Sequence, residues 1–209
     1  MNRRDYIGRL TNNDPTLIDF HINTKYFDNN YVKKIVNALK NNTQLESIHF
    51  DKGWYFSIEE IKDLANLLKN NKTLKILTLN YCNIRDDGMA ELSKTLKVNT
   101  TLKILNIRGN HIGIDGIKYL ADALKFNTSL VKIDMRPNIM HENFDFFIDE
   151  AIEILSDALQ YNYTLQKIIG INLGGIISKK KFLTTKSARK NWDWLNKFNQ
   201  SEFKKIEID

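Results

Sequence analysis

Five residues in the first quarter of the chain have the types that enzymes and metal sites use. They are Asp19, His21, Ser47, His49 and Asp51. A serine nucleophile needs a histidine base within hydrogen-bond reach and a carboxylate that orients it, whereas two imidazoles and carboxylates are also zinc ligands. On a strand, Ser47 and His49 would lie about 6.5–7 Å apart along the backbone. We therefore expect ordinary surface residues here, with no catalytic residue, no metal and no cofactor.

Other motifs that carry chemistry are absent from the sequence. It has no G-x-x-x-x-G-K-[ST] phosphate loop, no H-E-x-x-H zinc motif and no G-x-S-x-G nucleophile motif. Its one cysteine, Cys82, cannot form an intrachain disulfide or a multi-cysteine zinc site. No apolar run is long enough to span a membrane, and the polar N-terminus lacks the apolar core of a signal peptide. We expect a non-enzymatic, monomeric protein in the cytoplasm, or one delivered to a host cytosol without a signal peptide.

A block of alternating apolar residues recurs along the chain. The clearest copy reads Leu-Lys-Ile-Leu-Thr-Leu from Leu74, and similar blocks follow 28 and 56 residues later. The six copies begin at Leu17, Leu45, Leu74, Leu102, Leu130 and Leu165. Alternation predicts a strand in each copy, and a second block with apolar residues four apart predicts a helix. The elements that must position the chemistry-bearing residues are therefore repeated strand–helix units.

The pattern L-x-x-L-x-L-x-x-N/C-x-L and its period resemble the leucine-rich repeat of the ribonuclease-inhibitor type. Cys82, Asn110 and Asn138 occupy the N/C slot. The resemblance implies an α/β fold: a right-handed solenoid, or horseshoe arc, with a parallel concave sheet and convex helices. We assign residues 1–171 to an array of about six units with an N-terminal half-repeat cap. Residues 172–209 form a basic C-terminal helical cap in this interpretation.

A second series of asparagines follows the predicted helices. These cap asparagines are Asn13, Asn42, Asn71, Asn99, Asn127 and Asn162. Each lies three residues after a periodic leucine. Because asparagine tolerates the left-handed conformation that often ends a helix, we expect each to be a helix C-cap.

Proteins with this repeat commonly bind other proteins on the concave sheet, so the resemblance implies a site on the side chains between the leucines. The early strands carry His21, His49 and Asp51. The later strands carry Arg108, Lys132, Asp134, Arg136 and Lys167. We expect an acidic patch of a protein partner to face Arg108, Lys132 and Arg136. The loops at the rim add Trp54, Tyr55 and Tyr81 as aromatic anchors.

The net charge of +6 is unevenly distributed. Residues 179–209 contain 9 basic and 4 acidic residues, whereas residues 1–178 contain 22 and 21. An alternative site for RNA or the ribosome therefore comprises Lys179, Lys180, Lys181, Lys186, Arg189 and Lys190. A third interpretation, a GTPase regulator, follows only from the resemblance, which extends to Ran GTPase-activating protein. The Asn-, Lys- and Ile-rich composition suggests an AT-rich genome. A small repeat array with no attached domain resembles the effectors that intracellular bacteria or large viruses use inside host cells, so we expect a bacterial or viral effector.

Overall fold

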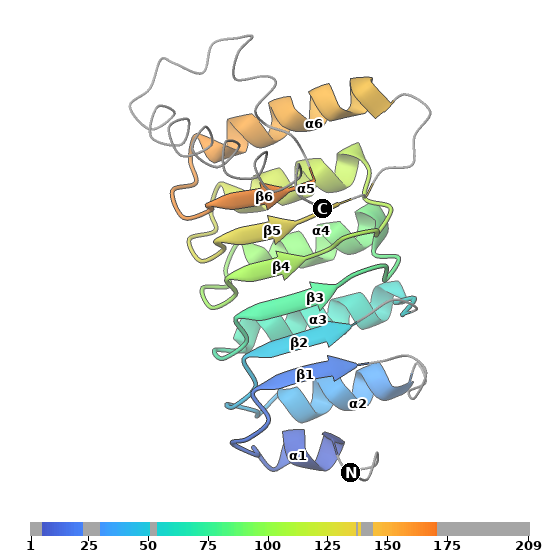
Figure 1. The fold of residues 1–209 in the computed structure, drawn as a ribbon, viewed down its shortest axis with the longest axis vertical. Coiled ribbons are helices and arrows are strands. Elements are labelled where there is room, and N and C mark those ends of the chain that lie inside the picture. The colour runs from blue at the N-terminus through green and yellow to red at the C-terminus, as the bar shows by residue number, and fades with distance from the viewer. Residues whose placement is uncertain (1–5, 23–29, 51–53, 137, 139–143, 171–209) are drawn as a thin grey trace, which may run out of the picture.

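The computed structural model describes residues 6–22, 30–50, 54–136, 138 and 144–170. Helices and strands alternate along these residues (Figure 1). The helices are α1 (Tyr6–Thr11), α2 (Asn30–Leu39), α3 (Ile58–Asn70), α4 (Arg85–Leu96), α5 (Ile114–Leu124) and α6 (Phe144–Leu159). The strands are β1 (Asp19–Ile22), β2 (Ser47–Phe50), β3 (Ile76–Leu79), β4 (Ile104–Asn106), β5 (Lys132–Asp134) and β6 (Lys167–Ile169). Within the described part of the chain, no helix has the length and apolar character needed to cross a membrane.

The strands form one parallel sheet whose order follows the chain from β1 to β6. The Cα partners are Asp19 with Ser47 and His21 with His49, and the same two rows continue to β6. Figure 1 shows the sheet along one side of the molecule and the helices along the other. This arrangement confirms the predicted solenoid and the predicted alignment of its units.

The repeated leucines fill the space between the sheet and the helices. Leu45, Leu74, Leu102 and Leu130 are each no more than 1% exposed. One strand and one helix cannot cover an apolar face by themselves, so each unit buries its leucines against the next unit. The result is a continuous core that leaves the outer face of the sheet to polar side chains.

The predicted N/C slot forms a hydrogen-bonded ladder beneath the loops that follow the strands. The amide nitrogen of Asn110 donates to the backbone oxygen of Leu79 (2.6 Å), and its amide oxygen accepts from the backbone N–H of Cys82 (2.8 Å). Asn138 repeats the pattern one unit later, with a bond to the backbone oxygen of Ile107 (2.8 Å). The buried Cys82 thiol fills the same slot and needs no catalytic explanation.

The prediction that every cap asparagine is a helix C-cap is confirmed for Asn71, which is the C-cap of α3, but it is wrong for α4 and α5, whose C-caps are Lys97 and Lys125. The left-handed conformation is not general either, since Asn13 has φ of 55° but Asn71 is extended, with φ of −69° and ψ of 134°. Their side chains form the bonds instead, as Asn99 shows. Its Nδ2 donates to the backbone oxygen of Leu68 (2.6 Å), while its Oδ1 accepts from the backbone N–H of Leu102 (2.8 Å). The asparagine side chain thus bonds a carbonyl at the end of the previous unit's helix and a backbone N–H just before the next strand. Because these bonds do not need a left-handed backbone, the residue can stay extended.

Helix starts are capped both within and between units. In α3, Ser57 and Glu60 form a capping box in which each side chain bonds the other residue's backbone N–H. The N-cap of α5, Gly113, instead donates its N–H to Oδ1 of Asp86 (2.6 Å), which lies in the first turn of α4. This bond ties two neighbouring units together at the rim of the sheet.

Candidate functional site

The basic side chains predicted to bind a partner gather over the last three strands. Lys132 and Lys167 are Cα partners on β5 and β6. Arg108 and Arg136 follow β4 and β5 at the same end of the sheet, and both are exposed. Because like charges on neighbouring strands repel one another, an acidic group placed over this surface would be favoured.

Asp134 lies within this basic surface and is already paired. Nε and Nη2 of Arg136 donate to its two carboxylate oxygens at 3.1 and 2.8 Å. Burial raises the pKa of Asp134, but the bonds from Arg136 lower it more, so the carboxyl group titrates below its usual range. Since this pair is neutral overall, the net positive charge of the surface comes from Arg108, Lys132 and Lys167.

The prediction that Trp54 is an exposed anchor is wrong. Its side chain is only 3% exposed, and its ring packs edge-on against Phe50 at 6.0 Å between centroids. The ring is therefore part of the hydrophobic core and is not available to a partner. The adjacent Tyr55 is 71% exposed and keeps its place as a candidate contact.

Tyr81 is half-buried at the same rim, over the loop that follows β4. Its backbone is left-handed, with φ of 57°. Gly109, with φ of 67°, lies so close that a Cβ there would come within 2.3 Å of the tyrosine ring. The guanidinium of Arg108 lies 5.5 Å from the ring centroid. Tyr81 therefore supports Arg108 at the edge of the basic surface.

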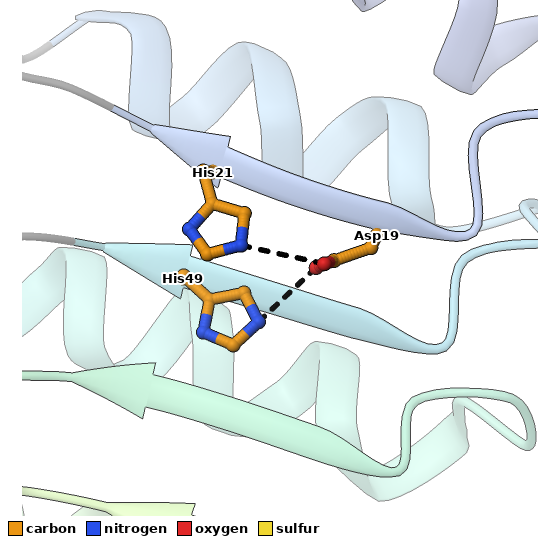
Figure 2. Close-up of side chains that lie close together, drawn as sticks. All are labelled: Asp19, His21 and His49. Atoms are coloured by element: carbon orange, nitrogen blue, oxygen red, sulfur yellow. Dashed lines mark ion pairs between the residues drawn. The ribbon is translucent and has the colours of Figure 1, made fainter.

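The other end of the concave sheet carries a compact histidine cluster, which comprises Asp19, His21 and His49 (Figure 2). The two imidazole rings stack with 4.1 Å between centroids and 5° between planes. Nε2 of His21 lies 3.3 Å from Oδ2 of Asp19, and Nε2 of His49 lies 3.1 Å from Oδ1. The parallel register of β1 and β2 makes this possible because it places the two histidines directly side by side.

A chain of hydrogen bonds extends from the cluster across the next two strands. Nδ1 of His49 lies 2.9 Å from Oγ1 of Thr78, which also accepts a bond from Nδ2 of Asn106 at 3.0 Å. On the other side, Oγ of Ser47 donates to Oδ1 of Asp19 at 2.6 Å. Burial raises the pKa of Asp19, but the bond from Ser47 and the two imidazoles lower it more.

This network does not have the geometry of a serine nucleophile. A hydroxyl nucleophile gives its proton to a histidine base, whereas the Ser47 proton points to Asp19. The arrangement therefore supports no nucleophilic role for Ser47. By contrast, Nε2 of His21, Nε2 of His49 and the carboxylate oxygens of Asp19 are atoms of the kind that bind a metal cation.

Comparison with known proteins identifies a sequence family and structures that resemble this chain. A sequence model described as Leucine Rich repeat matches residues 70–93 and 98–121. The chain has the leucine-rich repeat fold. The ribonuclease-inhibitor type remains a prediction. No curated protein matches this chain.

Two solved structures resemble this chain over almost its whole length. One is described as leiomodin-1 actin-binding site 2; it is 18% identical, with a TM-score of 0.53, and the match covers 97% of this chain and 91% of that one. The other is the tropomodulin C-terminal domain of Caenorhabditis elegans, which is 15% identical with a TM-score of 0.53 and 96% of each chain covered. At these identities the likeness is one of fold.

Sequence reasoning missed a series of exposed apolar side chains at equivalent positions of successive units. Val98, Phe126 and Tyr161 are 54%, 62% and 62% exposed and directly precede cap asparagines in successive units. The first three units have Asn12, Asn41 and Asn70 at this position. An alignment of the residue before each cap asparagine would have shown the change from amide to apolar side chains.

Several predicted site residues lie outside the described part of the chain. They are Asp51 and the basic residues Lys179, Lys180, Lys181, Lys186, Arg189 and Lys190. The early and late predicted residues that are described do not form one cluster. His21 and His49 lie on β1 and β2, while the basic surface begins after β4.

Proposed function

We propose that this chain is a non-enzymatic, monomeric interaction module that binds a protein partner through its concave sheet and rim loops. The observation that carries the proposal is the composition of the outer face of the sheet. The row of side chains that begins with Asp19 on β1 ends with Lys132 and Lys167 on β5 and β6, and the row that begins with His21 ends with Asp134 and Ile169. A surface that changes character along its length favours one orientation of a partner over the reverse.

The basic surface supports an acidic patch as the partner's contact. Arg108 and Arg136 are exposed, and both are held in place, by the Tyr81 ring and by the Asp134 carboxylate respectively. Side chains that are already ordered lose less conformational entropy on binding. Tyr55 and Tyr81 would extend the contact over the rim.

Actin is the first partner to test. One similar structure is described as an actin-binding site of leiomodin-1, and the match spans nearly the whole of both chains. The proposal for this chain does not depend on actin, because the same fold supports many partners. We further propose that the chain acts in a cytosol, as an effector of an intracellular bacterium or large virus, because a small leucine-rich repeat array resembles such effectors.

The experiment compares two triple charge reversals of equal size. Arg108→Glu, Lys132→Glu and Arg136→Glu reverse the concave surface, whereas Lys33→Glu, Lys34→Glu and Lys72→Glu change exposed residues elsewhere. Binding is measured with purified actin and with proteins captured from a eukaryotic lysate. We expect the first variant to weaken binding at least about tenfold and the second to leave it nearly unchanged. Equal binding by the two variants would contradict the proposed site.

A second candidate function rests on the excess of five positive charges over residues 179–209. We propose that residues 172–209 form a separate basic cap, which could bind RNA or the ribosome. Binding through phosphate contacts weakens steeply as salt rises. A filter-binding titration at several salt concentrations tests this function, and no retention of RNA at low salt would remove it.

A further inference from the structure

We propose that the histidine cluster is a Zn²⁺ site, with Nε2 of His21, Nε2 of His49 and one carboxylate oxygen of Asp19 as its protein ligands. The three ligand atoms lie within 4.8 Å of one another on neighbouring strands (Figure 2). Imidazole and carboxylate ligands suit zinc, and three protein ligands leave a fourth position for water or for a side chain of a partner. This site is separate from the basic surface and does not depend on the proposed function.

The distances between ligand atoms already approach those of a tetrahedral ion. With bonds of about 2.0–2.1 Å, two ligand atoms of tetrahedral zinc lie about 3.3 Å apart. Oδ2 of Asp19 lies 3.3 Å from Nε2 of His21, and Oδ1 lies 3.1 Å from Nε2 of His49. Each imidazole is therefore already at about this separation from one carboxylate oxygen, and a rotation of the half-exposed Asp19 carboxylate would bring a single oxygen toward both.

The surroundings of His49 allow its Nε2 to present a lone pair to a metal. A ligating histidine usually donates its other ring N–H to an oxygen acceptor. Oγ1 of Thr78 lies 2.9 Å from Nδ1 of His49 and can take that role, because its hydroxyl proton can rotate away. The hydroxyl is held by Asn106, so the acceptor is fixed before any ion arrives.

The histidine cluster has one mostly buried ligand and two ligands that are open to solvent. The side chain of His49 is only 17% exposed, whereas those of His21 and Asp19 are 61% and 51% exposed. The bond from Ser47 orients the Asp19 carboxylate. An ion can therefore enter from the concave side without any movement of the backbone, and the bound ion would join β1 to β2.

The test is a calorimetric titration of the full chain with zinc chloride. We expect one Zn²⁺ per chain to bind saturably to the wild type. His21→Asn and His49→Asn should each weaken binding at least about tenfold. The matched control is His111→Asn, since His111 is an exposed histidine in the loop after β4. This control should bind as the wild type does.

Two further measurements separate a built site from nonspecific binding. Thr78→Val removes the acceptor for His49 while it keeps all three ligands, and it should weaken zinc binding by about ten- to a hundredfold. Zinc should also raise the midpoint of thermal unfolding of the wild type but not of His21→Asn, because a ligand stabilises only the state that binds it. The exposed position of His21 keeps this variant folded. No saturable binding by the wild type, or binding that survives both histidine substitutions, would overturn the proposal.

Discussion

Asn110 shows how one buried side chain sets the spacing between neighbouring units. Its amide oxygen accepts from the backbone of Cys82 and Ile84, and its amide nitrogen donates to the backbone oxygen of Leu79. These bonds join the loops after β3 and β4 while the residue is fully buried. Each group that lost its partner would stay buried without a hydrogen bond, which costs about 1–3 kcal/mol.

Asn110→Ala should therefore lower the free energy of unfolding by about 3 kcal/mol or more. Urea denaturation followed by circular dichroism measures this loss. Asn37→Ala is the matched control because Asn37 is exposed on α2, and it should change stability by no more than about 0.5 kcal/mol. Similar losses in the two variants would show that the ladder does not stabilise the fold in this way.

Among the secondary-structure elements, α1 depends on a small cluster of polar contacts at its end. Oδ1 of Asp14 accepts from the hydroxyl and the backbone N–H of Thr16 at 2.7 and 2.9 Å, and its other oxygen accepts from Arg9 at 2.5 Å. These bonds lower the pKa of Asp14 to about 2, and the bond from the Thr16 hydroxyl makes the largest contribution. The carboxylate thus fixes the turn that leads from α1 to β1.

This depressed pKa predicts a pH dependence with a definite sign. The native state favours the ionised carboxylate, so its stabilising effect is complete above the unfolded pKa of 3.8 and is lost as the pH falls toward about 2. At about pH 5 the wild type should melt at a higher temperature than Asp14→Asn. The difference should shrink as the pH approaches 2. A difference that stays constant over this range would exclude the ionised carboxylate as its source.

The capping and the sheet register were not equally predictable from the sequence. Alignment of the units on their leucines paired the strand residues correctly because the strand block keeps its internal spacing, although the fifth unit is longer than the others. The conformation of Asn71 was missed because its sequence position does not reveal whether the backbone or the side chain satisfies the helix end. Likewise, the sequence around Trp54 is compatible both with an exposed aromatic ring and with a ring packed between turns, and only the structure shows that the ring is buried.

Across the whole molecule, each unit contacts mainly the units on either side of it. In the described sheet, each strand pairs only with the strands before and after it in the sequence. Leu77 and Leu105, on the central strands β3 and β4, are almost completely buried. Stability in such an array is approximately a sum of local terms and interfaces between neighbours. Among the described residues, β1 pairs only with β2, and the six residues of α1 contact α2 at the same end of the array.

Native-state hydrogen exchange should therefore show a gradient along the array. We expect the slowest exchange in β3, β4, α4 and α5, and faster exchange in α1 and β1, where opening breaks only one interface. Mass spectrometry of exchanged peptides measures the pattern. If all these segments exchanged at one common rate, the array would unfold as a single unit and this expectation would be wrong.

The sequence by itself determined the order of the strands, their register and the face on which the charged residues lie. It could do so because the leucine spacing forces every unit to pack in the same way against the previous one. Only the tertiary structure decided that Trp54 is buried, that Arg136 is paired with Asp134, and that two imidazoles share the carboxylate of Asp19. These contacts depend on side-chain rotamers and loop paths, which a repeat pattern does not specify.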